Sequence, residues 1–199
     1  MWDDAISAYA QSPFFLDNPP HTGLSTVMPM FSCPADTRTL AQSTKSGPMV
    51  AFTAYLGVDG TDQLKKDGIL FVDSSVRISD ITDGTSNTIM VGERPPSARE
   101  DLGWWYAGWG QSKDGSGDMD LGAQELNLSY YLDCPPGPYV FGPGAISNDC
   151  DAFHFWSLHP GGANFAFADG SVHFMAYSAA SIMPALATRA GGEVVSAPD

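Results

Sequence analysis

The segment that most constrains the fold lies late in the chain, where two apolar stretches flank an Asp-Gly pair. Residues 164–168 (Asn-Phe-Ala-Phe-Ala) and 171–175 (Ser-Val-His-Phe-Met) alternate in character on either side of Asp169-Gly170. This is the strongest short-range signal for a β-hairpin, and it predicts a two-residue turn in which both turn residues have positive φ. The register of such a hairpin decides which side chains are buried. We expect the core to receive Phe165, Phe167, Val172 and Phe174.

Composition favours short strands joined by ordered turns. The chain has 199 residues, including 21 Gly and 15 Pro, and aromatic residues make up 12% of it. This mixture suits strands and turns better than a helical bundle, and the aromatic content argues against disorder. We therefore expect one α+β domain over residues 1–199, built on an antiparallel sheet.

Local patterns predict individual elements within that domain. Helices are expected at 3–10 and 181–190, and strands at 50–58, 69–72 and 88–93. Residues 79–84 predict one helical turn, with Ser79 as its N-cap and Gly84 in the left-handed conformation. Residues 94–152 form a long insertion, which must be functional or held by its own aromatic cluster.

The charge of the chain excludes two classes of partner. Nine Lys and Arg against 23 Asp and Glu give a formal net charge of −14. A nucleic-acid backbone or an anionic membrane face would repel such a surface. No run approaches the roughly 20 apolar residues of a membrane helix, and the first residues lack the features of a signal peptide. Either the protein is cytoplasmic, or an export segment has been removed before residue 1.

Four sequence blocks together resemble a large bacterial family of pseudopilin-like proteins. The family signature, His-x9-Asp-Gly, corresponds to His159 and Asp169-Gly170. A second block, 81–93, contains Asp83, Gly84 and Asn87, and ends in Val-Gly-Glu. The other two blocks are Cys-Pro-Ala-Asp at 33–36 and the ending at 187–195. They follow the family's order over roughly residues 30–195, and their combination is more specific than any one of them.

The resemblance implies a structural role outside the cytoplasm. Family members begin with a prepilin-type leader and a long apolar helix, and this chain lacks both. The chain is therefore expected to be the globular head alone, periplasmic or at the cell surface, and not itself embedded in the membrane. It would be a subunit or tip of a pilus-like or type II secretion-like assembly, with other pilin-like subunits as partners through the absent helix. We expect the native gene to encode a basic leader and an apolar helix of about 20 residues or more before Trp2.

The three cysteines predict one disulfide. No Cys-x-x-Cys pair is present, which disfavours a structural zinc site. Cys134 and Cys150 bracket a Pro- and Gly-rich loop, where a bridge would contribute about 3 kcal/mol of stability. Cys33 is left unpaired, and its partner is expected in the missing segment.

The acidic run at 114–120 is a candidate for a structural calcium site. Oxygen-bearing side chains recur at Asp114, Ser116, Asp118 and Asp120, and the intervening glycines permit sharp turns. Glu125 is close enough in sequence to contribute. Major pseudopilins often hold a calcium ion in a late loop, so the resemblance supports this site. The alternative is a solvated acidic turn, and no cofactor is required.

Two patterns raise the possibility of chemistry, and neither is favoured. His159 and Asp169, with Ser157 or Ser171, could form a hydrolase triad, but Asp169 is explained by its turn and no Gly-x-Ser-x-Gly motif is present. His154, His159 and His173 could bind a transition metal, but their spacing does not favour it. We expect no enzyme, and structural roles for the signature residues.

The tryptophan-rich insertion supports an alternative function. Trp104, Trp105 and Trp109 could stack on sugars and form an adhesive or carbohydrate-binding face. Aromatic residues at this density more often pack against one another, and we expect packing here.

Overall fold

The computed structural model describes residues 2–36, 38, 42–43, 47–111, 113–128, 133–193 and 195, without the side chains of Gln42 and Ser43. Parts of the expected domain therefore lie outside the described residues. They include residues 112 and 129–132 of the insertion and Val194 of the fourth sequence block.

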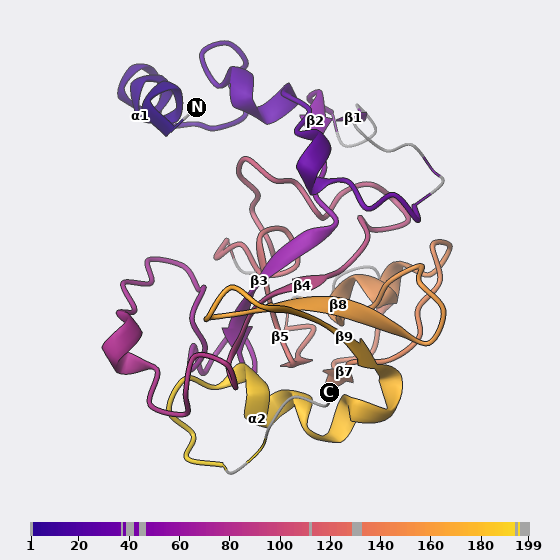
Figure 1. The fold of residues 1–199 in the computed structure, drawn as a ribbon. Helices are drawn as coiled ribbons and strands as arrows, with labels where there is room; N and C mark the ends of the chain where they lie inside the picture. The colour runs from indigo at the N-terminus through magenta and orange to yellow at the C-terminus, as the bar shows by residue number, and fades with distance from the viewer. Residues whose placement is uncertain are drawn as a thin grey trace.

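A five-stranded sheet forms the centre of the molecule (Figure 1). Its order is β5-β3-β4-β8-β9, and every neighbouring pair is antiparallel except β3 and β5. The strands are β3 (Tyr55–Gly60), β4 (Ile89–Glu93), β5 (Asp120–Gly122), β8 (Gly162–Phe167) and β9 (Val172–Ala176). The expected α+β fold is confirmed. The parallel edge strand β5 comes from the long insertion, which contributes to the central sheet.

The remaining elements are short. Two further strand pairs are β1 (Gln42–Ser43) with β2 (Val50–Ala51), and β6 (Gln124–Glu125) with β7 (Tyr139–Val140). The helices are α1 (Trp2–Gln11), η1 (Thr22–Ser25), η2 (Pro29–Phe31), η3 (Ile78–Asp80), η5 (Asp149–Phe153), η6 (Tyr177–Ser181) and α2 (Met183–Ala187). Among the described residues, no helix has the length and apolarity that a bilayer crossing requires.

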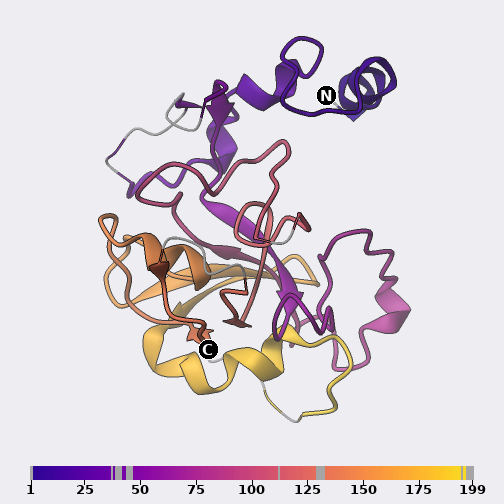
Figure 2. The ribbon, with the colours of Figure 1, turned by 180° about the vertical axis from the view of Figure 1, so that it is seen from behind.

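The main core lies between the sheet and the C-terminal helices. In Figures 1 and 2, η6 and α2 run beneath the sheet, and the N-terminal segment with α1 lies at the opposite end. Leu56 and Val58 of β3 pack with Phe165 of β8 and with Met183 and Leu186 of α2. A second cluster joins the N-terminal segment to the insertion through Leu24, Val50, Phe52 and Trp104.

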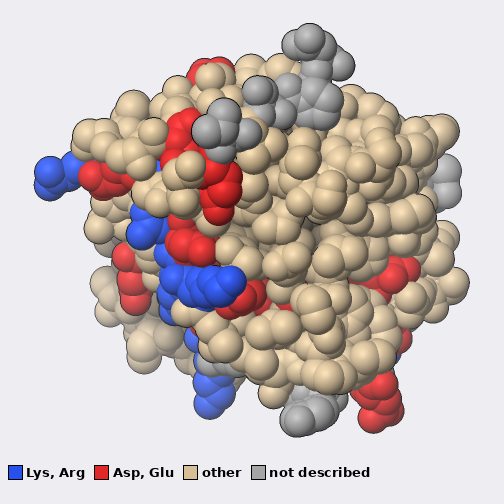
Figure 3. All heavy atoms as spheres, turned by 90° about the horizontal axis from the view of Figure 1, so that it is seen from below, with Lys and Arg blue, Asp and Glu red and all other residues tan. Residues whose placement is uncertain are grey.

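Charged side chains gather toward one side of the underside of the molecule. Figure 3 shows Asp and Glu atoms lying beside Lys and Arg atoms there, while most of the remaining visible surface carries no charge. Because opposite charges lie side by side there, their fields partly cancel, and the visible face presents no large area of a single sign.

Several predicted elements are confirmed and others need correction. The helix at 3–10 is α1, and the strand at 88–93 is β4. The strand predicted at 50–58 is two strands, because Thr53 turns the chain between them. Its Oγ1 accepts a hydrogen bond from Tyr55 N–H and donates one to Tyr55 O. The helix predicted at 181–190 is confirmed in part as the shorter α2, with Pro184 in its first turn.

Two predictions in the 69–84 region were wrong. Residues 69–72 do not form a strand, because the N–H groups of Ile69 and Leu70 share one acceptor on β3, Val58 O, and no regular ladder develops. The segment lies over β3 instead, with Leu70 close above Gly57. The helical turn is η3, with Arg77 and not Ser79 at its N-cap position, and Asp80 Oδ2 accepts a hydrogen bond from Arg77 N–H. The left-handed conformation at Gly84 is confirmed, with φ of 97°.

The predicted hairpin is present as β8 and β9, but its turn is longer than two residues. Phe167 O accepts a hydrogen bond from Gly170 N–H, and Phe167 N–H donates to Ser171 O. Only Gly170 of the Asp-Gly pair has a positive φ, at 87°. This pattern is a type I turn followed by a one-residue bulge.

The bulge changes which β9 side chains face the core. Phe165 and Phe167 are fully buried as expected, but Val172 is 66% exposed and Phe174 is 49% exposed. Phe165 pairs with His173 across the ladder, so His173 and Met175 lie on the core side. The ring of His173 packs edge-on against Phe167, with 5.0 Å between centroids. The expected burial of Val172 and Phe174 was therefore wrong.

Candidate functional site

The acidic run at 114–120 does not direct its four predicted ligands to one point. Asp118 is buried, and its two oxygens accept hydrogen bonds from the N–H groups of Gly103 and Gly110. Burial raises its pKa to about 6, against the lowering effect of these bonds and of Arg94. Ser116 Oγ accepts from Gln111 Nε2. These two side chains hold the insertion together, so the predicted set of ligands is not assembled.

Asp114 and Asp120 instead line a narrow pocket beside β3. Its other polar residues are Asp59, Gln63 and Lys66. Gly57 of β3 pairs with Asp120 of the parallel strand β5. Asp120 therefore projects from the face of the sheet that carries Gly57, and Asp59, at the register shift between Val58 and Gly60, lines the same pocket. That face is opposite the one on which Leu56 and Val58 pack.

Two oxygens at this pocket are buried without a hydrogen-bond partner. Asp59 is 2% exposed and Gln63 is 3% exposed, and neither Asp59 Oδ1 nor Gln63 Oε1 has a partner. The Gln63 amide is fixed because Nε2 donates to Leu126 O at 2.8 Å. Leaving a buried acceptor unsatisfied costs about 1–3 kcal/mol. Such atoms therefore point to a missing electropositive group.

The carboxylates around this pocket have raised pKa values. Burial, and then the charges of Glu125 and Asp120, raise the pKa of Asp59 to about 9. Burial and the charge of Asp114 raise the pKa of Asp120 to about 8, and burial raises that of Glu125 to about 7. Glu125 has protein donors, the N–H groups of Gly122 and Leu126. A cation in the pocket would stabilise the ionised forms of Asp59 and Asp120.

The residues of the His-x9-Asp-Gly signature lie at opposite ends of strand β8. His159 lies just before the strand and Asp169 just after it, and six residues of strand span about 20 Å. Asp169 is exposed at the turn, where Oδ1 accepts from the N–H and Oγ of Ser171. These hydrogen bonds lower its pKa. Asp169 cannot orient His159, so the structure does not form the triad that the sequence suggested.

His159 contacts two side chains that are distant in sequence. Its Nε2 lies 3.6 Å from Cys33 Sγ and 3.4 Å from Glu93 Oε1. Glu93 and Cys33 are buried, and the His159 side chain is 30% exposed. These two side chains are therefore the partners of the His159 imidazole. Glu93 ends the second sequence block, but nothing in its local sequence marked it as a partner of His159.

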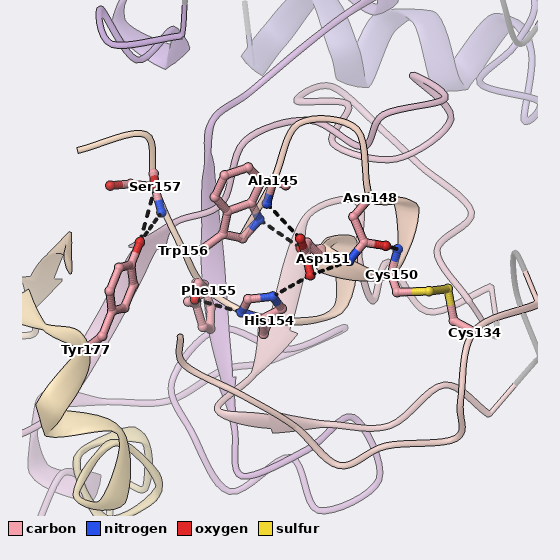
Figure 4. A network of polar contacts seen from close by, with 10 residues as sticks. All are labelled: Cys134, Ala145, Asn148, Cys150, Asp151, His154, Phe155, Trp156, Ser157 and Tyr177. Atoms are coloured by element: carbon pink, nitrogen blue, oxygen red, sulfur yellow. Dashed lines mark hydrogen bonds and ion pairs between the residues drawn. A yellow bond between two sulfur atoms is a disulfide. The ribbon is translucent and has the colours of Figure 1, made fainter. Parts of the chain in front are cut away.

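The other histidines lie elsewhere. Figure 4 shows His154 between Asp151 and the backbone of Phe155, with Nε2 3.1 Å from Asp151 Oδ1. His173 Nε2 lies 3.0 Å from Ser171 Oγ on the hairpin. The three histidines considered as a metal site therefore have separate partners and do not converge.

The disulfide between Cys134 and Cys150 is confirmed. It joins the start of the Pro- and Gly-rich loop to η5, next to the Asp151 network (Figure 4). Asp151 accepts hydrogen bonds from Ala145 N–H and Asn148 Nδ2. The bridge and this network hold the part of the insertion around η5. Cys33 is unpaired and buried.

The second sequence block holds the C-terminal segment in place. Asp83 accepts hydrogen bonds from the N–H groups of Gly191 and Gly192. Asn87 Nδ2 donates to Asp83 O, and Gly84 provides the turn between them. These contacts fit the expected structural roles of Asp83, Gly84 and Asn87.

The three tryptophans do not form one face. Trp104 is buried with Leu24 and Phe52. Trp105 is half-buried, and its Nε1 donates to Thr26 O. Trp109 is 40% exposed and lies beside the rings of Phe14 and Phe15. Packing therefore accounts for Trp104 and Trp105, and Trp109 remains as the exposed ring.

Comparison with known proteins places the chain in a family. The sequence profile described as "Protein of unknown function (DUF1559)" matches residues 4–181. The chain belongs to this family. No curated protein and no solved structure matches it. The DUF1559 match covers both the carboxylate pocket and the contacts of His159, so both features lie within the family region of the chain.

Proposed function

We propose that this DUF1559 chain is the extracytoplasmic head of a pilin-like structural protein, a subunit or tip of a pilus-like or type II secretion-like assembly. The observation that carries the proposal is the family match over residues 4–181, together with the four blocks that resemble pseudopilin-like proteins. Other pilin-like subunits would be its partners, through an apolar helix encoded before Trp2. The head would lie in the periplasm or at the cell surface.

The disulfide supports this location. Disulfides such as Cys134–Cys150 form and persist in oxidising compartments and are rare in the cytosol. The buried position of Cys134 in the cluster with Leu102 and Phe153 makes the bridge part of the core. A protein that folds around such a bridge is best suited to conditions outside the cytoplasm.

The arrangement of the signature residues supports a role without catalysis. Asp169 caps its own turn, and His159 lies at the other end of β8. A triad needs a nucleophile and an acid on opposite nitrogens of one imidazole. At His159 both the thiol and the carboxylate face Nε2.

A calcium ion is proposed as a stabilising component of the head. Ca²⁺ takes 6–8 oxygen ligands, as carboxylates, amide oxygens and waters. Asp59, Gln63, Asp114 and Asp120 carry ligands of this kind and line one narrow pocket, whose side chains would have to move to enclose the ion. The unpartnered Asp59 Oδ1 and Gln63 Oε1 are oxygens that the ion would satisfy. Two of the four ligands predicted from the sequence, Asp114 and Asp120, are retained, while Asp59 and Gln63 take the places of Ser116 and Asp118.

The location and assembly can be tested in the native host. The chromosomal gene would be tagged at its C-terminus, and cells with and without the prepilin peptidase would be fractionated and sheared. We expect the tagged head in the sheared surface fraction of the wild type, with an oxidised Cys134–Cys150 pair, and its loss from that fraction without the peptidase. A reduced protein found in the cytosol of both strains would overturn the proposal.

A further inference from the structure

We propose that Cys33, Glu93 and His159 form a binding site for a thiophilic divalent metal ion of the Zn²⁺ class, with one coordination position open to solvent. This site is separate from the carboxylate pocket and does not depend on the pilin-like function.

The three ligand atoms already lie near the corners of one tetrahedral face. Zn²⁺ binds sulfur at about 2.3 Å and nitrogen or oxygen at about 2.0–2.2 Å, which places tetrahedral ligand atoms about 3.3–3.6 Å apart. Here Sγ to Nε2 is 3.6 Å, Nε2 to Oε1 is 3.4 Å, and Sγ to Oε1 is 4.0 Å. Only the distance from Sγ to Oε1 exceeds this range, and a shift of a few tenths of an ångström in one side chain would bring it within the range.

Each ligand is positioned by a different part of the fold. Cys33 follows η2, Glu93 is the last residue of β4, and His159 lies in the turn before β8. Neighbouring groups orient the carboxylate, because Asn164 N–H donates to Glu93 Oε2 at 2.6 Å and Asn164 Nδ2 contacts both Glu93 oxygens at 3.2 Å. Supporting hydrogen bonds of this kind are typical of metal sites.

The protein alone does not stabilise the thiolate form of Cys33. Burial raises the pKa of the Cys33 thiol and the charge of Glu93 adds to this, against the lowering effect of the backbone N–H groups of Ala35 and Asp36. A metal ion would supply the positive charge that the buried thiolate lacks. Without that charge the thiol stays protonated, which argues against a nucleophilic cysteine.

Access and selectivity also favour a metal ion. Cys33 is 6% exposed and Glu93 2%, whereas the His159 side chain is 30% exposed and leaves one side open. One sulfur, one imidazole nitrogen and one carboxylate oxygen suit Zn²⁺ and similar ions and do not suit Ca²⁺ or Mg²⁺. Three protein ligands with a fourth position for water is the arrangement of an open zinc site.

The test uses the purified, disulfide-intact chain after EDTA treatment and dialysis. Co²⁺ is titrated as a coloured substitute for Zn²⁺, and Zn²⁺ is then added as a competitor. We expect one equivalent of Co²⁺ to produce a thiolate-to-cobalt charge-transfer band in the near ultraviolet, which Zn²⁺ removes and Ca²⁺ does not. Cys33→Ser should abolish the band, and His159→Ala should weaken Co²⁺ binding at least 10-fold. His173→Ala, a histidine of the hairpin, is the matched control and should bind as the wild type does.

A second measurement needs no variant. Zn²⁺ should slow alkylation of Cys33 in the unmutated chain at least 10-fold, measured by mass spectrometry at a denaturant concentration below the unfolding transition. Absence of the charge-transfer band, its survival in Cys33→Ser, or an alkylation rate that Zn²⁺ leaves unchanged would each overturn the proposal. The assembly and fractionation experiment would be unaffected by any of these results.

Discussion

At the scale of single residues, Asp59 departs furthest from the environment of an ordinary carboxylate. It is buried on β3, one of its oxygens has no partner, and its pKa is raised to about 9 by burial and by neighbouring acids. Asp120 on the adjacent strand is raised to about 8. The native state without a cation therefore retains protons that the unfolded chain loses at about pH 4.

This difference predicts an unusual pH dependence. A group whose pKa is higher in the native state than in the unfolded chain contributes to the stability of the native state. This contribution is fully present below the pKa of the group in the unfolded chain, and it is lost as the pH rises through the pKa of the group in the native state. In EDTA, the melting temperature should fall between about pH 5 and pH 9, which covers the pKa values of about 9 and about 8 at Asp59 and Asp120. Added Ca²⁺ should raise the melting temperature most at the alkaline end of this pH range. Thermal melts at several pH values, with EDTA or Ca²⁺, measure both effects.

Asp59→Asn tests whether the pH dependence of stability and the response to Ca²⁺ both originate at this pocket. The substitution removes one buried ionisable group. At pH 8 in EDTA we therefore expect the free energy of unfolding of the variant to be at least about 1 kcal/mol higher than that of the wild type. The response to Ca²⁺ should be lost. Asp133→Asn, at an exposed position, is the control and should leave both quantities unchanged. A wild-type melting temperature that Ca²⁺ does not move at pH 8 would contradict the site.

Trp109 carries the remaining case for a carbohydrate-binding face. Its ring is exposed beside Phe14, whereas Trp104 is buried and Trp105 is tied to Thr26. Since the exposed rings of Trp109 and Phe14 lie at 77° to each other and form no flat stacking surface, we expect soluble glycans to leave the tryptophan fluorescence unchanged, both in the wild type and in Trp109→Phe. A saturable change in the wild type that Trp109→Ala abolishes would favour an adhesin.

At the scale of elements, the β8–β9 hairpin depends on a bulge at Gly170. Gly170 has φ of 87°, and a Cβ there would meet no atom within 4 Å. Substitution is therefore opposed by backbone conformation alone and not by crowding. The same turn sets the register that buries Phe165 and Phe167.

Gly170→Val should lower the free energy of unfolding by about 1–2 kcal/mol or slightly more, because a β-branched residue resists the left-handed region. Ser171→Ala, which removes a hydroxyl that donates to Asp169 and contacts His173 Nε2 at the surface, should cost less, about 0.5 kcal/mol. Chemical denaturation of the two variants provides the comparison. Equal losses would show that the turn conformation is not what holds the hairpin in register.

At the scale of the whole molecule, non-covalent contacts join the insertion to the rest of the fold, and a disulfide closes a loop within the insertion. Its strand β5 joins the sheet, Trp104 packs on the N-terminal segment, and the disulfide closes the loop before η5. The family match across residues 4–181 includes these parts.

Non-reducing mass mapping should find Cys134 bridged to Cys150, and Cys33 as the thiol that is alkylated after unfolding. Replacing both bridged cysteines by alanine should lower the free energy of unfolding by about 2–4 kcal/mol, because their separation of 16 residues closes a sizeable loop in the unfolded chain. Three free thiols after preparation under oxidising conditions would contradict the expected pairing.

The sequence by itself determined the features that depend on local interactions. The alternating stretches around Asp169-Gly170 predicted the hairpin, the apolar run at 88–93 predicted β4, and Gly84 was placed correctly in a left-handed turn. The spacing of Cys134 and Cys150 around one loop predicted their bridge. Each of these signals is contained within a few neighbouring residues or one loop.

The tertiary structure alone decided the sites. Asp59 lies with Asp120 because β5 pairs in parallel with β3, and Cys33, Glu93 and His159 meet because three separate segments converge. Asp118 was predicted as a ligand from its spacing, but burial near Arg94 gave it backbone partners instead. Contacts between residues distant in sequence depend on strand order and packing, which local pattern does not encode. A single bulge at Gly170 was likewise enough to place His173, and not Phe174, on the core side of the sheet.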